Sequence, residues 1–265
     1  MHFPHGRNKH KQQYTKEVLM EEIIPADIEI RKNSIAIVGW DEGGAGQVHS
    51  WLEKQGQYHI ACFVNDADVP VQVDIETERK KRPAQQFDFP LQASFKNKPM
   101  ITSTRWLNII LDLGITKALV MTPNKQQRMH QIREAQKKIE LISAIHPTAL
   151  ILEDAILHEN LIIFTRAIIG YRTELYPGVT VNTNSVIEHH NVVKSCTIID
   201  PGVKTAGNVL IGECVHIHTG TTIIPKIKIG DNSIVGAGSV VIKDVPENVT
   251  VVGNPARIIK RSWPQ

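Results

Sequence analysis

Two adjacent histidines interrupt an otherwise aliphatic run in the C-terminal half of the chain. They are His189 and His190, in the segment SVIEHHNVV. An imidazole takes up and releases a proton near neutral pH, so either ring could act as a general base. Both could equally be solvated surface residues. The structural element that carries the pair decides between the two interpretations.

A six-residue repeat surrounds the pair and predicts that element. Every sixth position from Ile145 to Val241 is Ile, Leu or Val in 16 of 17 cases, with Thr205 as the exception. An uninterrupted hexapeptide repeat predicts a parallel β-helix, in which each aliphatic residue points into a triangular prism. Three hexapeptides make one coil, so residues 18 apart stack at about 4.8 Å, the spacing of neighbouring strands.

Stacking by 18 predicts the neighbours of the histidine pair. Both histidines follow an inward-pointing isoleucine, so they belong on the outer wall or at a turn. His189 should lie between Tyr171 in the preceding coil and Gly207 in the next one. A glycine beside the ring leaves open space and an unobstructed backbone N–H. That arrangement suits a general base next to an oxyanion donor.

The N-terminal half follows a different pattern, in which buried strands alternate with helices. This alternation predicts right-handed βαβ units and a parallel sheet, which binds ligands at the carboxyl ends of its strands. The run IELISAI (139–145) is predicted to be its last strand. The predicted organisation is a polar extension over 1–33, an α/β, Rossmann-like nucleotide-binding domain over 34–142 and a β-helix over 143–265.

Composition argues against several classes of function. The 265 residues carry a formal net charge of only +3, and no basic stripe indicates a nucleic-acid partner. Apolar runs fall short of the ~18 residues of a membrane span, and the N-terminus lacks the apolar core of a signal peptide. Three cysteines do not form a disulfide framework. We therefore expect a cytoplasmic protein without membrane insertion or nucleic-acid binding.

Four segments of the β-helix resemble a known family. They are VNTNSVIEHH (181–190), TAGNVLIG (205–212), SIVGAGSVV (233–241) and VVGNPAR (251–257). They look like the left-handed β-helix acyltransferases of bacterial sialic-acid, bacillosamine and perosamine pathways, which act on nucleotide-linked amino sugars. The resemblance implies a Rossmann-like domain, a left-handed parallel β-helix that carries the chemistry, and acetyl-CoA as co-substrate. It also implies a homotrimer with its active site between adjacent prisms, and a closed cyclic assembly is physically reasonable for a rod without a cleft of its own.

The resemblance also implies roles for individual residues at the reacting centre. His189 matches the family's catalytic base, and Gly207 matches the glycine whose N–H polarises the thioester carbonyl. Asn182, seven residues before the base, matches a contact to the sugar. His190 is a further candidate substrate contact, and either histidine could be the one that carries the proton.

Other family positions fall on candidate contacts to the two substrates. Thr219 and Ala237 match the lining of the CoA tunnel, and Arg257 matches a basic residue near the adenine or its phosphate. In the first domain, Asn65 and Asp66 occupy the family's strand-end acidic segment, which contacts the nucleotide.

Several positions depart from the family pattern. The family has Asp or Glu directly after the base, where it orients the imidazole; here that position is His190, which is not expected to do so. A second family histidine corresponds to Ile198. The nearest carboxylate is then Glu188. In the first domain, Trp40, Asp41 and Glu42 precede the glycines of a family turn that approaches phosphate, and acidic groups disfavour phosphate there.

Two other pairs could carry metal or thiol chemistry. His216 and His218 alternate on a strand, but the β-helix has no HxxxxH pair of the kind that zinc β-helix carbonic anhydrases use. His218 instead stacks on Asp200, with which it could form a structural hydrogen bond. Cys196 and Cys214 also stack and are expected to be ordinary thiols. No metal cofactor is predicted.

The leading hypothesis is an acetyl-CoA-dependent acyltransferase that acetylates the amino group of a nucleotide-linked sugar. One alternative is a sugar O-acetyltransferase. The other is a non-catalytic β-helix trimer that serves as a binding or assembly protein, which the missing carboxylate and the missing second histidine would favour.

Overall fold

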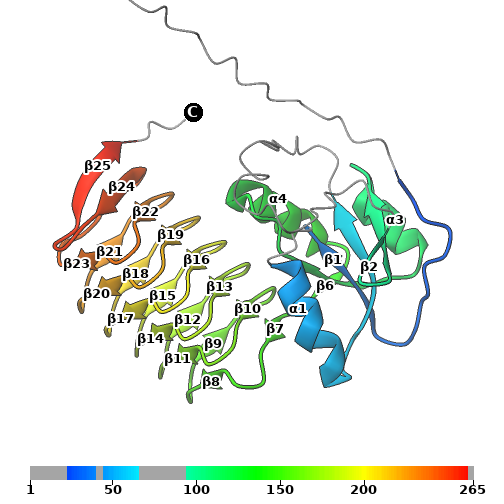
Figure 1. Ribbon diagram of the computed structural model, residues 1–265, viewed down its shortest axis with the longest axis horizontal. Coiled ribbons are helices and arrows are strands. Elements are labelled where there is room, and N and C mark those ends of the chain that lie inside the picture. Colours follow the sequence, from blue (N-terminus) through cyan, green and yellow to red (C-terminus); the bar gives the residue numbers. More distant parts are fainter. Residues whose placement is uncertain (1–22, 40–43, 66–93, 262–265) are drawn as a thin grey trace, which may run out of the picture.

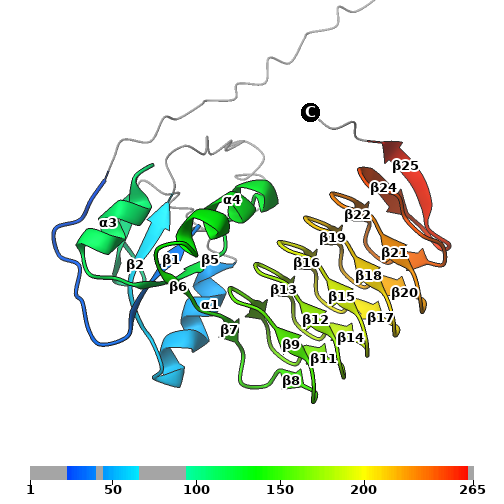
Figure 2. The ribbon, with the colours of Figure 1, turned by 180° about the vertical axis from the view of Figure 1, so that it is seen from behind.

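The computed structural model describes residues 23–39, 44–65 and 94–261. An α/β domain and a β-helix lie beside each other, and the coils of the β-helix lead away from the contact towards the C-terminal strands (Figure 1). The view from behind shows the same order, with helix α4 on the side of the α/β domain that faces the coils (Figure 2). Among the described residues, no helix has both the length and the apolar character that crossing a membrane requires.

The α/β domain is a six-stranded sheet with flanking helices. Its strands, in spatial order, are β3 (Ser94–Phe95), β4 (Lys98–Thr102), β2 (His59–Asn65), β1 (Ser34–Val38), β5 (Lys117–Val120) and β6 (Glu140–Leu141). Its helices are α1 (Ala45–Leu52) with the 3₁₀ turn η1 (Glu53–Gln55), α3 (Trp106–Asp112) and α4 (Lys125–Ala135). All strand pairs are parallel except β3 with β4. The continuous apolar runs of β1 and β2 fit strands that are covered on both faces.

The strand order reverses at β1. Strands β2 and β4 follow on one side of β1, while β5 and β6 follow on the other. Gly39, directly after β1, has a φ of +87°, and a Cβ there would clash with the backbone of Thr122 beyond β5. The ends of β1 and β5 therefore meet closely at the carboxyl edge. In open α/β sheets this reversal point is where ligands bind.

The β-helix has three parallel faces, which we number in chain order. The first face contains β7 (Ala144–Ile145), β10 (Ile162–Ile163), β13 (Thr180–Val181), β16 (Ile198–Ile199), β19 (His216–Ile217), β22 (Ile234–Val235) and β24 (Val249–Val252), and ends on the antiparallel β25 (Arg257–Arg261). The second contains β8 (Leu150–Ile151), β11 (Ile168–Ile169), β14 (Val186–Ile187), β17 (Lys204–Thr205), β20 (Thr222–Ile223) and β23 (Val240–Val241). The third contains β9 (Ile156–Leu157), β12 (Glu174–Leu175), β15 (Val192–Val193), β18 (Leu210–Ile211) and β21 (Lys228–Ile229).

The structure confirms the predicted repeat. Neighbouring strands pair residues 18 apart, such as Val186 with Lys204 and Ile187 with Thr205. The second residue of each strand points into the prism and is buried from β10 to β23, which gives one continuous aliphatic core. Many corners contain a residue with positive φ, including His190 at 58°. Asparagine, which tolerates this conformation better than most residues, is frequent there.

The prediction of one strand over 139–145 was wrong. The segment divides into β6, which pairs with β5 at the edge of the sheet, and β7, which begins the first face of the β-helix. Ser143 lies between them. The apolar run is continuous because both ends are buried, although in different cores. The short strands β3 and β25 were also not expected.

Buried polar contacts join the two domains. The Asn160 side chain in the first coil exchanges two hydrogen bonds of 2.7 Å with the backbone of Val120 at the end of β5. Arg128 of α4 is buried and donates to the Thr180 hydroxyl (2.9 Å) and to the Gly178 carbonyl (3.2 Å). Such satisfied buried groups are costly to separate. The carboxyl edge of the sheet thus adjoins the β-helix.

The inward and outward positions of one strand should differ sharply in their effect on stability. In β18, Ile211 is fully buried, whereas Leu210 is 37% exposed. We expect Ile211→Ala to lower the free energy of unfolding by about 2–5 kcal/mol, because it opens a cavity in the prism. Leu210→Ala removes the same kind of side chain from the outer wall and should cost less than about 1 kcal/mol. Chemical denaturation measures both, and equal losses would contradict the assigned orientation of the strand.

Candidate active site

His189 lies at the corner between the second and third faces, directly after Glu188 and β14. Its side chain is exposed, and its ring rests against Gly207 of the next coil. A Cβ at position 207 would come within 2.5 Å of Nε2 and 2.8 Å of Nδ1 of that ring. Only glycine leaves room for the imidazole here. The stacking predicted from the 18-residue spacing is therefore present.

The backbone around the ring leaves one donor available. The Asn208 N–H bonds to the His189 carbonyl (3.0 Å), and the Gly207 carbonyl accepts from Lys226 (3.2 Å). Among the described residues, the Gly207 N–H donates to no acceptor. A free N–H next to an imidazole can stabilise negative charge that develops on a nearby oxygen.

His190 contacts the ring of His189 directly. The two Nδ1 atoms lie 3.0 Å apart, so one nitrogen must donate and the other accept. If His189 Nδ1–H donates, Nε2 of His189 keeps its lone pair and can act as a base. Neutral His190 then accepts through Nδ1 and carries its own proton on Nε2. The expectation that a histidine at this position cannot orient the base is corrected, because a neutral imidazole has one acceptor nitrogen.

Tyr171 supports the second ring from the preceding coil. Its ring meets the His190 ring edge to face, with centroids 5.7 Å apart. The Tyr171 carbonyl accepts the His190 backbone N–H at 2.9 Å. No described contact joins the Glu188 carboxylate to either histidine, so Glu188 does not replace the family's missing acid.

A buried polar pair beneath the histidines was missed from the sequence. Thr205, the single exception in the aliphatic series, is 2% exposed inside the prism. Its hydroxyl accepts from the Glu188 N–H (3.2 Å) and from the Asn191 side chain (2.5 Å). Asn191 also accepts from the Val209 N–H at 2.6 Å. These bonds fix the corner that carries both histidines, and the break in the aliphatic series was the signal that could have revealed them.

The other predicted contacts in the β-helix lie away from His189. Asn182 precedes β14 at the corner between the first and second faces, and its side chain donates to the Ile199 carbonyl (3.1 Å). Thr219 and Ala237 occupy the same corner on later coils and are exposed. Arg257 begins β25, is exposed and donates to the Ala256 carbonyl. Within one chain, the width of the second face separates these residues from the histidine pair.

The predicted nucleotide contacts are only partly within the described residues. Asn65 ends β2 at the carboxyl edge of the sheet and is 9% exposed. Its carbonyl accepts the Ser103 N–H at 3.1 Å. Asp66 and the segment 40–43, as well as most of the predicted extension, lie outside the described residues.

His216, which begins β19, and His218, which follows it, converge on one carboxylate. Asp200 Oδ2 lies 3.1 Å from Nε2 of His216 and 3.0 Å from Nδ1 of His218. Partial burial opposes ionisation of Asp200, but the hydrogen bonds and charges of the two histidines hold its pKa below the usual value. The Asp200–His218 contact follows from stacking by 18. The participation of His216 was not predicted.

The stacked cysteines lie under helix α4. Cys196 and Cys214 are both buried and belong to an apolar cluster with Ile132 of that helix. Burial raises the pKa of Cys196 to about 12, so its reactive thiolate is scarce at neutral pH. This environment favours ordinary packed thiols.

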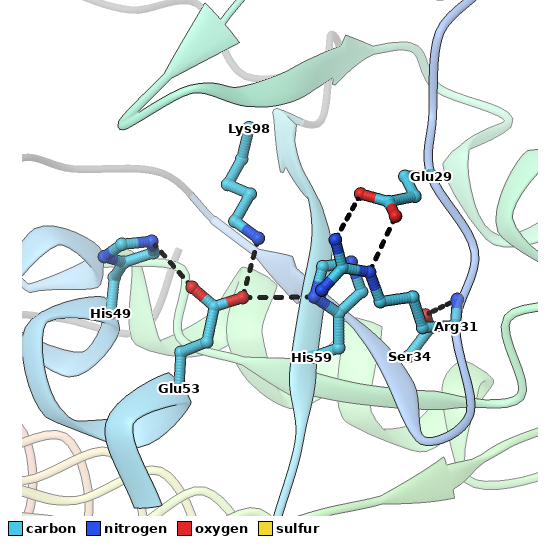
Figure 3. A network of polar contacts seen from close by, with 7 residues as sticks. All are labelled: Glu29, Arg31, Ser34, His49, Glu53, His59 and Lys98. Carbon is cyan, nitrogen blue, oxygen red and sulfur yellow. Dashed lines mark hydrogen bonds and ion pairs between the residues drawn. The ribbon is translucent and has the colours of Figure 1, made fainter. Parts of the chain in front are cut away.

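A second polar network lies at the opposite edge of the sheet (Figure 3). Glu53 accepts from Lys98 (2.6 Å) and contacts His59 (3.1 Å), while His49 stays 3.6 Å away. Partial burial opposes its charge, but the bond from Lys98 keeps the pKa of Glu53 below its usual value. His59 and Lys98 begin their strands, so the network is at the amino edge of the sheet, away from the reversal point at the carboxyl edge.

The β-helix matches known transferases in sequence. Residues 208–243 match the family described as Bacterial transferase hexapeptide (six repeats). Over 122 residues the chain is 33% identical to serine acetyltransferase of Synechococcus elongatus. The match covers 44% of this chain and 43% of that protein. Over 92 residues it is 38% identical to galactoside O-acetyltransferase of Escherichia coli. This match covers 35% of this chain and 42% of that protein. The chain thus spans less than half the length of these curated relatives.

Solved structures resemble most of the chain. The acetyltransferase domain of PglB from Neisseria gonorrhoeae, in complex with acetyl coenzyme A, matches with a TM-score of 0.70 and 27% identity over 86% of this chain and 99% of that one. PerB from Caulobacter crescentus, in complex with CoA and GDP-perosamine, matches in fold with a TM-score of 0.70 and 24% identity over 91% and 100%. This chain therefore carries the bacterial transferase hexapeptide repeat and has the fold of the left-handed β-helix sugar acyltransferases.

Proposed function

We propose that the protein is an acetyl-CoA-dependent acyltransferase that acetylates the amino group of a nucleotide-linked sugar. One observation carries the proposal. The exposed ring of His189 lies against Gly207, whose N–H is free among the described residues, and His190 contacts Nδ1 of the same ring. This corner therefore combines a base, a group that orients it and an oxyanion donor.

The reaction follows from these three groups. Nε2 of His189 removes a proton from the sugar amine as the nitrogen attacks the thioester carbonyl. Negative charge on the carbonyl oxygen is stabilised by the N–H of Gly207. When the tetrahedral intermediate collapses, the C–S bond breaks, the amide remains and the proton on His189 passes to the CoA sulfur. Much of the rate enhancement comes from holding amine and thioester in contact.

The separation of the candidate contacts supports a homotrimer. Asn182, Thr219 and Ala237 share one corner, whereas His189 occupies the next. A site that uses both corners must take them from two copies of the chain. Three prisms around a threefold axis would bring each such pair of corners together. Arg257, which begins β25 on the last coil, would contact CoA farther along the same groove. A cytoplasmic location, where acetyl-CoA and nucleotide sugars are available, fits this function.

The first domain is proposed to hold the nucleotide. Its strand order reverses between β2 and β5 around β1, as in Rossmann-like sheets, and Asn65 lies at that edge. Asp66 is assigned to the same site. The Asn160 and Arg128 contacts keep this edge next to the β-helix, so a nucleotide bound there could extend its sugar towards the coils. Binding of GDP-perosamine by PerB, which shares the fold, supports a nucleotide sugar as acceptor.

O-acetylation is the second candidate. Over 92 residues the chain is 38% identical to galactoside O-acetyltransferase, which supports a hydroxyl acceptor. The same base and oxyanion donor would serve a hydroxyl acceptor. Amino sugars and their hydroxyl counterparts, tested side by side, distinguish the two.

Removal of the base should slow transfer strongly. We expect His189→Ala to lower kcat by about 10²–10⁴-fold, because general-base catalysis is lost. Release of CoA thiol from acetyl-CoA is measured against UDP-, GDP- and dTDP-linked amino sugars. His146→Ala, a histidine on the first coil, is the control and should keep its activity. Unchanged turnover in His189→Ala would remove His189 as the base.

His190 should act as a positioning residue. We expect His190→Ala to lower kcat by about 10–100-fold with little change in KM, because the His189 ring loses its acceptor. His190→Asp restores an acceptor, and aspartate tolerates the positive φ at this position. It should therefore recover most of the lost activity. Equal defects in both variants would mean that His190 contributes shape and not a hydrogen bond.

A methyl group at position 207 should displace the catalytic ring. Gly207 does not have a left-handed backbone, so alanine causes no backbone strain, but its Cβ would occupy the place of the His189 imidazole. We expect Gly207→Ala to lower kcat by about 10–100-fold, since even small misplacements of reacting groups are costly. Thermal unfolding should change little because the ring can swing into solvent. Full activity would show that the ring does not act from this position.

A further inference from the structure

One cluster on the β-helix has the composition of a metal site. In the part of the chain that the structure describes, Asp200, His216 and His218 are the only group of three potential metal ligands whose donor atoms lie within 4.8 Å of one another. Their side chains are 22–38% exposed, so an ion could reach them from solvent. The proposed acetyl transfer does not use this cluster.

The repeat holds the three side chains together. His216 and His218 point outwards on either side of the inward Ile217, and Asp200 stacks under His218 one coil earlier. Backbone bonds lock this register, from Asp200 N–H to the Ile217 carbonyl (2.9 Å) and from His218 N–H to the Val235 carbonyl (2.8 Å). Little conformational entropy is therefore lost when the three side chains bind one ion.

We propose that Asp200, His216 and His218 bind a divalent first-row transition-metal ion of the zinc class. Two imidazoles and one carboxylate suit ions of this class, whereas calcium and magnesium prefer a site made of oxygen ligands alone. The carboxylate oxygen lies 3.0 and 3.1 Å from the two ring nitrogens. Neighbouring ligands around an ion at about 2.1 Å have nearly this separation. Three protein ligands leave at least one position for water.

Binding requires a rearrangement of protons within the cluster. In the absence of metal, Nε2 of His216 and Nδ1 of His218 face the Asp200 carboxylate, and a hydrogen bond to it requires a proton on each of these nitrogens. The ion displaces both of these protons and takes the two nitrogens and the carboxylate oxygen, so that a neutral ring then carries its proton on its other nitrogen. Protonated rings must lose a proton first, so acid weakens binding.

The ion would act as a clamp between coils. Asp200 follows β16, whereas His216 begins β19 and His218 follows it, so one ion would join two successive coils of the first face. A ligand that binds only the folded chain raises its stability. Metal binding should therefore raise the thermal unfolding temperature without any acceptor or CoA present.

Calorimetric titration with Zn²⁺ tests the proposal on the full chain after treatment with a chelator. We expect one ion per chain, and at least about tenfold weaker binding in Asp200→Asn and in His216→Gln. His158→Gln is the matched control. It alters a histidine that bonds a carboxylate in the same β-helix, Nε2 to Glu174 Oε1 at 2.9 Å, but without a third ligand. This variant should bind Zn²⁺ as the wild type does.

A second measurement keeps the result independent of folding and of transferase activity. Co²⁺ bound at the site should produce visible absorption bands in the wild type and in His158→Gln but not in Asp200→Asn, whose metal-free unfolding temperature shows whether it is folded. Absence of saturable Zn²⁺ binding in the wild type would overturn the proposal. So would folded Asp200→Asn and His216→Gln variants that bind with wild-type affinity.

Discussion

The stacking of residues 18 apart at one strand spacing is the constraint on which the rest of the structure depends. Every coil of the β-helix repeats the backbone of the coil before it, so a side chain on the wall has a neighbour that the sequence itself specifies. The aliphatic series fills the prism, and the outer positions are left for chemistry. The β-helix thus holds exposed functional groups on a rigid backbone, whose core positions are almost all Ile, Leu or Val.

The same constraint generates both candidate sites. Gly207 lies beside His189 because they are 18 residues apart, and Asp200 lies under His218 for the same reason. Where the series is broken, at Thr205, the buried hydroxyl stabilises the corner beneath the histidine pair. A site of this kind needs no mobile loop. Its limitation is shape, because two corners of one convex rod cannot face each other. This is the physical reason for proposing that two copies share a site.

The α/β domain is held in a defined position against the β-helix. Buried contacts of Asn160 and Arg128 fix the carboxyl edge of the sheet against the early coils. Because these groups are desolvated and paired, sliding of one domain over the other would leave them unsatisfied at a cost of about 1–3 kcal/mol each. In the proposed reaction the nucleotide would bind at the carboxyl edge of the sheet and CoA along the coils.

The sequence by itself determined the β-helix, its register and the neighbours of His189, because a strict repeat turns sequence distance into spatial distance. It also indicated the alternating strands and helices before it. Only the tertiary structure decided where the run at 139–145 divides, since both halves are apolar and only their partners differ. Only side-chain geometry showed that His190 can accept a bond from His189, and that His216 joins Asp200. Such contacts depend on rotamers and tautomers, which a pattern of residue types does not specify.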